Sequence, residues 1–233
     1  MNNIYLKDSY QNELQTTIIK SDGRFIVLQD NIFYPQSGGQ PTDTGTLTNN
    51  DQTSKVIFAK KIDGKVSLQT DTESLKKDDS VTAKIDWDRR YKFMRYHTAS
   101  HILASAIYQD TGALITGNQL DLDKSRIDLN LEEFNREQFY EYQDKANEII
   151  KSNLSITTEN LPYNEAMKIK SIFRLKGVLP PTLKEIRIVK VGDYDIQACG
   201  GTHVKETKEI GKLKIISMDN KGKNNRRVYF TLE

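Results

Sequence analysis

The placement of the histidines and of the single cysteine constrains the fold of this sequence most. The 233-residue chain contains three histidines and one cysteine, and they form two pairs whose members are four residues apart. One pair is His97 and His101, and the other is Cys199 and His203. Thiolate and imidazole are the ligands that zinc prefers, and a site takes about four of them in a tetrahedron. The sequence therefore predicts a fold in which two distant segments meet around one Zn²⁺ ion.

Each pair is expected in a local conformation that directs both side chains to one point. His97 and His101 fall in a helix predicted over residues 87–108, where residues four apart share one face. A Gly-Gly-Thr segment separates the members of the second pair, and its two glycines predict a tight turn. A lone cysteine is usually a small buried apolar residue. An alternative role for Cys199 is that of a nucleophile paired with His203.

The number of candidate ligands leaves the role of the metal open. Four protein ligands are typical of a structural zinc, whereas a catalytic zinc keeps one position open. Three arrangements remain: one ligand is weak or displaced, the ion becomes five-coordinate, or the metal only organises a pocket. No acidic residue stands out in the sequence as a general base.

Composition restricts the class of protein. Hydrophobic residues make up 36% of the chain and charged residues 28%, which is typical of globular proteins. No apolar run is long enough to cross a bilayer, and the N-terminus lacks the pattern of a signal peptide. A single cysteine excludes an intrachain disulfide. We therefore expect a cytoplasmic protein that has no membrane partner.

The basic residues concentrate toward the C-terminal end. The formal net charge of the whole chain is only +2, but eight basic residues face three acidic ones between positions 205 and 227. Because a local excess of positive charge attracts polyanions, we expect a nucleic acid to contact this end of the chain.

Residues 1–84 are predicted to form a small β-barrel domain. Short apolar and β-branched stretches alternate there with turn signals such as Ser21-Asp22-Gly23. The stretches predicted as strands are 16–19, 25–28, 56–59 and 65–68.

Residues 85–233 are predicted to form an α+β domain. Asp86 is expected to cap the first helix and Gly112 to end it, and a second helix is expected from about Glu132 to Lys151. Strands are expected at 127–129, 156–158, 186–189, 213–216 and 227–230. This order predicts helices packed on an antiparallel sheet.

Several motifs resemble those of alanyl-tRNA synthetase editing domains. The segments His97–Leu103 and Cys199–His203 look like the paired motifs of that domain. The segment Phe33–Gly45 is similar to the glycine-rich motif of the β-barrel that precedes it, and Asp86–Arg90, Arg95 and Gly211–Ile215 also match. The resemblance covers nearly the whole chain, and 233 residues leave no room for the aminoacylation part of a synthetase. The chain therefore looks like a free-standing AlaX editing protein of the medium-length type.

The resemblance implies a zinc-dependent hydrolase that deacylates mischarged tRNA(Ala). The expected substrate is principally Ser-tRNA(Ala), with Gly-tRNA(Ala) as the second candidate, and no obligate protein partner is expected. One alternative is a structural-zinc RNA-binding module without catalysis. Another is editing of a different tRNA, such as threonyl-tRNA, although the alanyl-type motif from Phe33 to Gly45 argues against it.

Selectivity for serine requires a polar partner for the serine hydroxyl, because a hydroxyl distinguishes serine from alanine. The candidates are Thr116, near which the related family has a threonine, and Ser100, where synthetases often have threonine. Thr116 is alternatively an ordinary loop or strand residue. The resemblance also implies that Gly38, Gly39 and Gln40 line the substrate pocket, although a glycine-rich loop by itself is more often a hairpin connection.

The predicted tRNA contacts are seven basic side chains in two groups, one near the first metal pair and one near the C-terminus. They are Arg89, Arg90, Arg95, Lys221, Lys223, Arg226 and Arg227. The alternative for all of them is an ordinary solvated surface charge.

Overall fold

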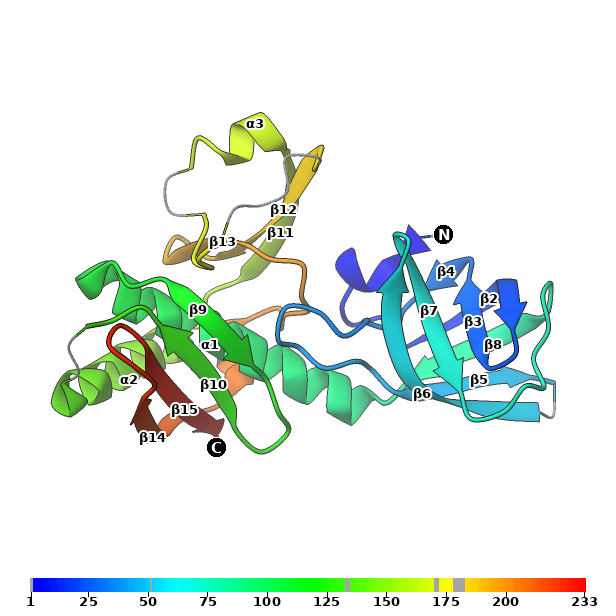
Figure 1. Ribbon diagram of the computed structural model, residues 1–233, viewed down its shortest axis with the longest axis horizontal. Coiled ribbons are helices and arrows are strands. Elements are labelled where there is room, and N and C mark those ends of the chain that lie inside the picture. The colour runs from blue at the N-terminus through cyan, green and yellow to red at the C-terminus, as the bar shows by residue number, and fades with distance from the viewer. Residues whose placement is uncertain (1, 51, 133–134, 170–171, 178–182) are drawn as a thin grey trace. The chain divides into compact units, whose positions relative to one another are not determined.

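The computed structural model describes residues 2–50, 52–132, 135–169, 172–177 and 183–233 (Figure 1). The chain divides into two compact units, Met1–Phe93 and Met94–Glu233, and the division falls within helix α1 (Trp87–Thr111). The barrel domain predicted from the sequence ends at residue 84, which lies in the last barrel strand. The first unit extends further because Trp87 packs against the barrel core.

The first unit contains a closed, antiparallel, six-stranded barrel, and the second combines helices with antiparallel sheets, as the sequence predicts (Figure 1). Around the barrel the strands are β2 (Glu13–Asp22), β3 (Phe25–Leu28), β7 (Lys65–Thr70), β6 (Gln52–Ile62), β5 (Gly45–Asn49) and β8 (Ser80–Ile85). The four stretches predicted as strands lie in β2, β3, β6 and β7. The sequence analysis missed β5 and β8, although Val81, Ala83 and Ile85 alternate into the core.

Short elements precede the barrel and complete the first unit. Strand β1 (Asn2–Asn3) pairs in parallel with β4 (Asp30–Asn31), and a 3₁₀ turn, η1 (Ile4–Leu6), follows β1. Tyr5 of this turn is buried and meets Tyr34 edge to face, with ring centroids 5.5 Å apart. The turn therefore adds aromatic side chains to the barrel core.

A buried ion pair joins the start of α1 to the glycine-rich segment of the first unit. The side chains of Arg90 and Asp43 are both 0% exposed and are bonded to each other. Arg90 also donates to the carbonyl oxygens of Ser9 (2.9 Å) and Ile32 (2.6 Å). The Asp43 carboxylate in turn accepts a hydrogen bond from the backbone N–H of Tyr34, at 2.6 Å. The pair thus ties four segments of the unit together.

The second unit contains a four-stranded antiparallel sheet. Its order is β14 (Leu213–Asn220), β15 (Arg226–Leu232), β10 (Ser125–Leu129) and β9 (Ile115–Gln119). Helix α2 (Arg136–Lys151) packs against β14, where the amide of Asn147 bonds both backbone groups of Leu213 at 2.9 Å.

The helix ends follow local capping chemistry. Asp86 accepts a hydrogen bond from Arg89 N at 3.2 Å and so caps α1, as predicted. Gly112, which follows the last residue of α1, has φ +68, a left-handed conformation that favours glycine. Helix α2 begins at Arg136 rather than near Glu132, because Asn135 accepts a hydrogen bond from Glu137 N and caps it there. Residues 133–134 lie outside the described part of the chain.

A second, three-stranded antiparallel sheet leads into the C-terminal metal pair. Its order is β11 (Ile156–Pro162), β12 (Glu185–Val191) and β13 (Asp195–Ala198), with the short helix α3 (Tyr163–Ala166) beside it (Figure 1). After β13, the chain continues through the 3₁₀ turn η2 (Thr207–Ile210) into β14. Among the described residues, no helix is both long and apolar enough to span a membrane.

Candidate metal centre

The two predicted ligand pairs meet in the second unit. His97, His101, Cys199 and His203 each offer one donor atom, and these atoms all lie within 4.8 Å of one another. The Sγ atom of Cys199 is 3.5 Å from Nε2 of His97 and 3.4 Å from Nε2 of His203. All three histidines are buried, and the cysteine is partly buried. The fold therefore brings the two distant segments together around one point.

Helix geometry accounts for the first pair and loop contacts for the second. His97 and His101 are on one face of α1, with ring centroids 5.2 Å apart. In the loop after β13, neither Gly200 nor Gly201 has the left-handed backbone conformation that would make a tight glycine turn. Instead, Nη1 of Arg187 donates to the carbonyls of Cys199 and Gly201, at 2.8 and 3.0 Å, and holds the loop in place.

Two further side chains contact the imidazoles on the side away from the thiol. The hydroxyl of Thr98 lies 3.1 Å from Nδ1 of His203. Asp195, at the start of β13, places Oδ2 at 3.7 Å from Nδ1 of His101. Metal-bound histidines commonly have a hydroxyl, carbonyl or carboxylate at their second nitrogen, and the surroundings of both rings have this form.

The electrostatic environment favours a thiolate at Cys199. Burial alone would raise the pKa of the thiol, but the three surrounding imidazoles lower it well below its usual value. Burial would also lower the pKa of His101, but the thiolate and Asp195 together raise it to about 9. Burial and the neighbouring His97 lower the pKa of His203 well below its ordinary range. The metal-free centre thus combines a thiolate with a protonated His101 and a neutral His203.

The donor set fits a Zn²⁺ ion. Three imidazoles and a thiolate are borderline-soft ligands of the kind that zinc binds. Zn–N distances of about 2.0 Å and a Zn–S distance of about 2.3 Å in a tetrahedron separate sulfur from nitrogen by roughly 3.5 Å. The two sulfur–nitrogen distances of 3.5 and 3.4 Å agree with that value. The four residues could therefore hold this ion without a large rearrangement of the thiol and its two neighbours.

Comparison with known proteins identifies two family models. The model of the threonyl and alanyl tRNA synthetase second additional domain matches residues 186–229, which include Cys199 and His203. The model of class II (A) tRNA synthetases matches residues 3–89, which include the barrel.

Relatives extend the match to nearly the whole chain. The alanyl-tRNA editing protein AlaX-M of Methanosarcina barkeri is 44% identical over 98% of this chain and 98% of its own length. The AlaX-M of Saccharolobus solfataricus is 40% identical over 99% of this chain and 98% of its own length. This chain belongs to the AlaX-M alanyl-tRNA editing protein family. The alanine–tRNA ligase of Thermococcus kodakarensis is 37% identical over 91% of this chain, but over only 24% of the ligase.

In this AlaX-M family member, the two candidate serine-binding residues have different surroundings. Thr116 is exposed on β9, and its hydroxyl donates to Oδ1 of Asn225 at 3.3 Å. Ser100 is 3% exposed, and its hydroxyl donates to the carbonyl of His97 at 2.7 Å, within α1. Ser100 therefore has its hydrogen engaged beside a metal ligand.

The glycine-rich residues of the AlaX-M barrel form a hairpin turn. The backbones of Ser37 and Gln40 exchange hydrogen bonds of 3.1 and 2.9 Å across Gly38 and Gly39. Both glycines have positive φ, +56 and +83, as a two-residue turn of this kind requires. The side chain of Gln40 is buried. A pocket-lining role for these three residues stays a prediction.

Two of the seven predicted tRNA contacts do not fit the structure. Arg90 is buried and bonded to Asp43, and Arg226 is only 5% exposed, with hydrogen bonds to carbonyls that include those of Glu132 and Gly222. Because both guanidinium groups serve internal acceptors, neither is available to a phosphate. We therefore correct the prediction for these two arginines.

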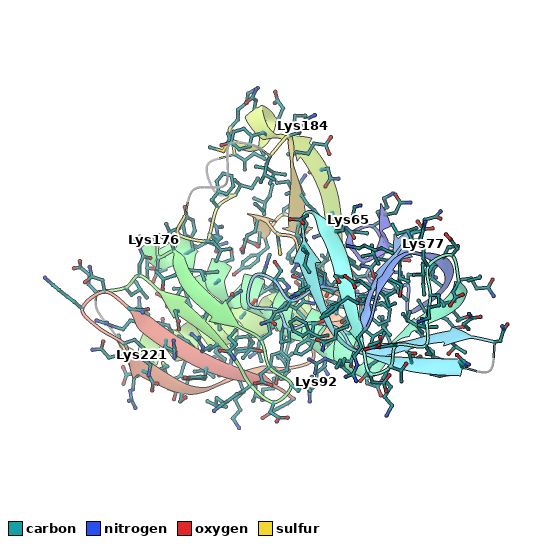
Figure 2. The ribbon with its side chains drawn as sticks, turned by 45° about the vertical axis from the view of Figure 1, so that its right-hand side comes forward. Lys65, Lys77, Lys92, Lys176, Lys184 and Lys221 are labelled. Carbon is teal, nitrogen blue, oxygen red and sulfur yellow. The ribbon has the colours of Figure 1, made fainter. Side chains whose placement is uncertain are left out.

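The other five predicted tRNA contacts are half-buried or exposed. Arg89, Arg95 and Arg227 are half-buried and donate to Thr42 O, Ile210 O and the Asp128 carboxylate, respectively. Lys221 and Lys223 are exposed, and Lys221, on the outside of the fold near β15 (Figure 2), lies 3.1 Å from the carboxylate of Asp219. A tRNA contact of these five residues stays a prediction.

Sequence reasoning missed the side chains around the ligands. Thr98 and Arg187 gave no signal of their own, because hydroxyl and guanidinium groups are common and their partners are distant in sequence. Asp195 did leave a signal. It precedes Cys199 by four residues, with Gln197 between them, and residues at this spacing in a strand share one face. A carboxylate on the face that leads to a ligand is a candidate partner for the metal centre.

Proposed function

We propose that this chain is a zinc-dependent hydrolase that deacylates mischarged tRNA(Ala), principally Ser-tRNA(Ala) and also Gly-tRNA(Ala). The observation that carries the proposal is the convergence of the four donor atoms in this chain. Its relatives across nearly the full length, at 40–44% identity, are named alanyl-tRNA editing proteins. Those names favour an alanyl rather than a threonyl substrate, although one matching family model covers both synthetases.

His97, His101, Cys199 and His203 would hold the ion. A zinc ion at this position supplies a Lewis acid for the ester that joins an amino acid to the 3′-terminal ribose. The chain's own residues prepare the centre before substrate arrives. Thr98 holds the ring of His203, and Arg187 holds the backbone around Cys199. Such fixed ligands reduce the reorganisation required when the substrate binds.

Thr116 is our proposed partner for the serine hydroxyl. Its hydrogen is donated to Asn225, so the oxygen lone pairs remain able to accept a hydrogen bond from a substrate O–H. Its strand is also connected to the metal centre: Ile115 N donates to Arg174 O at 2.7 Å, and Arg174 contacts Asp195 beside His101. Without Thr116, the hydroxyl of the substrate's seryl group would lose its hydrogen bonds to water and gain none from the protein.

Deacylation of three substrates tests the proposal. Ser-tRNA(Ala), Gly-tRNA(Ala) and Ala-tRNA(Ala) are incubated with the zinc-loaded protein, and the free amino acid is measured. We expect release of serine and glycine, while Ala-tRNA(Ala) is spared. Binding of all three tRNAs without release of any amino acid would instead support an RNA-binding module. Equal rates on the seryl and alanyl substrates would contradict an editing function.

The variant Thr116→Val tests the role of the hydroxyl at nearly constant volume. Loss of one hydrogen bond to the substrate is worth about 1–3 kcal/mol, so deacylation of Ser-tRNA(Ala) should fall roughly 5- to 150-fold. Deacylation of Gly-tRNA(Ala) should stay the same, because glycine has no hydroxyl. Thr158→Val, at an exposed position of β11, is the matched control and should change neither rate. An equal loss on both substrates would rule out recognition of the serine hydroxyl by Thr116.

A further inference from the structure

Asp195 is a buried carboxylate that lies beside the metal centre without being one of its four donors. Its side chain is 0% exposed, and Oδ2 lies 3.7 Å from Nδ1 of His101. That nitrogen is itself buried and has no hydrogen-bond partner among the residues that the structure describes. Since Nδ1 faces Asp195, Nε2 is the nitrogen of His101 left for an ion. The arrangement is one small movement short of a hydrogen bond.

The corresponding nitrogen of His203, Nδ1, already has a hydrogen-bond partner, the hydroxyl of Thr98. Thr98 donates its hydroxyl hydrogen to Met94 O at 3.0 Å, so its oxygen must accept from Nδ1–H of His203, at 3.1 Å. This hydrogen bond fixes the tautomer of His203 and leaves the lone pair of Nε2 toward the thiol, 3.4 Å away. His203 thus has a neutral oxygen behind its ring, whereas His101 has a charged one.

Neighbouring side chains hold the Asp195 carboxylate in place from both oxygens. Nε2 of Gln197 donates to Oδ2 at 2.9 Å, and Nη2 of Arg174 lies 3.5 Å from Oδ1. The guanidinium of Arg174 is buried and stacks on the ring of Tyr108 of α1, 3.6 Å from its centroid. If the carboxylate turned away from His101, it would lose its buried contacts with Gln197 and Arg174 and leave the Arg174 charge without its partner.

We propose that Asp195 is the positioning residue for His101, which it holds in the tautomer that directs Nε2 to the metal ion. In the loaded protein Asp195 accepts a hydrogen bond from Nδ1–H, which fixes the ring and strengthens Nε2 as a donor. Arg174 balances the charge of the carboxylate. The inference rests on the zinc centre of the proposed function and adds a residue outside the four ligands.

Zinc affinity of Asp195→Asn tests the inference. The amide keeps the volume and one acceptor oxygen but removes the charge, and loss of such a partner costs roughly 10- to 100-fold in metal affinity. Affinity is measured by competition with a chromophoric chelator. The matched control is Asp193→Asn, which makes the same change at an exposed turn position two residues away and should bind zinc like the parent chain. Equal zinc affinities for the two variants would overturn the inference.

Two further measurements separate positioning from a purely structural role. The melting temperature of metal-free Asp195→Asn should be close to that of metal-free Asp193→Asn. The Co²⁺ absorption bands of Asp195→Asn should shift relative to those of Asp193→Asn. If metal-free Asp195→Asn melted well below metal-free Asp193→Asn and the Co²⁺ bands of the two variants were the same, the inference would be overturned. For the case that Asp195→Asn does not fold, ¹⁵N spectra of the zinc-loaded parent chain report the tautomer of His101 directly. Nδ1–H is expected, and Nε2–H would overturn the inference.

These measurements use metal and no tRNA, so they are independent of the editing assay. A parent chain that binds zinc but releases no amino acid would contradict the proposed function and leave the role of Asp195 intact. A parent chain that deacylates Ser-tRNA(Ala) but binds zinc as well after Asp195→Asn as before would contradict only the role of Asp195. A parent chain that binds no zinc would overturn both.

Discussion

Each of the two units of this protein buries a cluster of polar side chains, but only one of the clusters is complete within the protein. In the first unit, Arg90 is surrounded by acceptors: both oxygens of Asp43 and the carbonyls of Ser9 and Ile32. In the second unit, the ligand atoms of three histidines and one cysteine lie within 4.8 Å of one another. The hydrogen-bond donors of Arg90 already have acceptors within the protein and need no ligand. Four side chains that can each donate an electron pair to the same point are instead completed by a cation.

The donors and acceptors of a buried polar cluster indicate whether it stabilises the fold or binds a ligand. Burial of charged groups is costly unless they are paired, so both clusters must be satisfied in some way. The Arg90 cluster is satisfied by residues from the same unit and therefore indicates stability. The four side chains of the metal centre, His97, His101, Cys199 and His203, can all donate an electron pair once His101 gives up its proton, and their donor atoms lie within 4.8 Å of one another. This cluster therefore indicates a metal-binding site. Three predictions test this contrast.

The largest effect is expected from Cys199→Ser, which removes the thiolate from the metal centre. The variant should lose tightly bound zinc, and deacylation of Ser-tRNA(Ala) should fall roughly 10³- to 10⁴-fold, because a metal contributes several kcal/mol to such a reaction. Metal content is measured by elemental analysis alongside the rate. His101→Ala should have the same two effects.

The same pair of measurements separates a metal ligand from a nucleophile. A nucleophilic cysteine predicts that Cys199→Ser is inactive but keeps full zinc occupancy. It further predicts that His101→Ala, in which the thiol is intact, keeps some of its activity. Either result would contradict the assignment of Cys199 as a ligand.

An effect of about 3 kcal/mol on stability is expected from Arg90→Met in the barrel. Methionine fills much of the volume but leaves Asp43 as an uncompensated buried charge, and breaking a buried pair is strongly destabilising. Urea unfolding is followed by the fluorescence of Trp87, the single tryptophan, which packs against the barrel core. Zinc content should remain at one ion per chain, since no donor is altered.

Arg89→Met is the matched control for that measurement. Arg89 is the adjacent residue of α1, is half-buried and donates to a single carbonyl, that of Thr42, at 3.1 Å. Its removal should cost about 1 kcal/mol. If the two variants were equally stable, the buried contacts of Arg90 would not stabilise the first unit more than those of Arg89.

The sequence predicts the metal centre far better than the Arg90 cluster. Histidine and cysteine are rare in this chain, so two four-residue pairs stand out against the background. Arginine is common, and the position of Arg90 beside other basic residues suggested a surface role that its burial contradicts. Its partner Asp43 is many residues away, and no local pattern links the two. Pairings of this kind follow from the tertiary fold.

A similar limit applies to secondary structure. Strands with several β-branched residues in a row, such as those in β3 and β12, are evident from the sequence. Strand β5 is polar and begins with Gly45, and β9 contains Gly117, so neither has a strong local signal. Both exist because neighbouring strands supply hydrogen-bond partners. The loop from Cys199 to His203 shows the same effect, since Arg187 rather than glycine geometry shapes it.

The smallest expected effect is a release of protons when zinc binds. It tests the contrast with the Arg90 cluster, because a metal centre must lose protons from its ligands before they can bind zinc. In the metal-free protein His101 has a pKa of about 9, while the pKa of Cys199 is well below its ordinary value. At pH 8 the cysteine is then a thiolate and His101 is protonated. Zinc requires a neutral imidazole, so binding should release close to one proton at pH 8 and almost none at pH 10.

Calorimetry of zinc binding in buffers with different ionisation enthalpies measures this number. The sign of the linked effects is fixed: a raised pKa stabilises the metal-free fold at pH values below about 6.5, and this contribution is lost as the pH rises through about 9. Zinc competes with that proton, so its affinity should rise roughly tenfold per pH unit up to about 9 and then level off. Release of two protons at pH 8 would indicate that Cys199 starts as a thiol. Release of none would indicate that His101 starts neutral, and in either case the imidazolium–thiolate description of the empty centre would have to be abandoned.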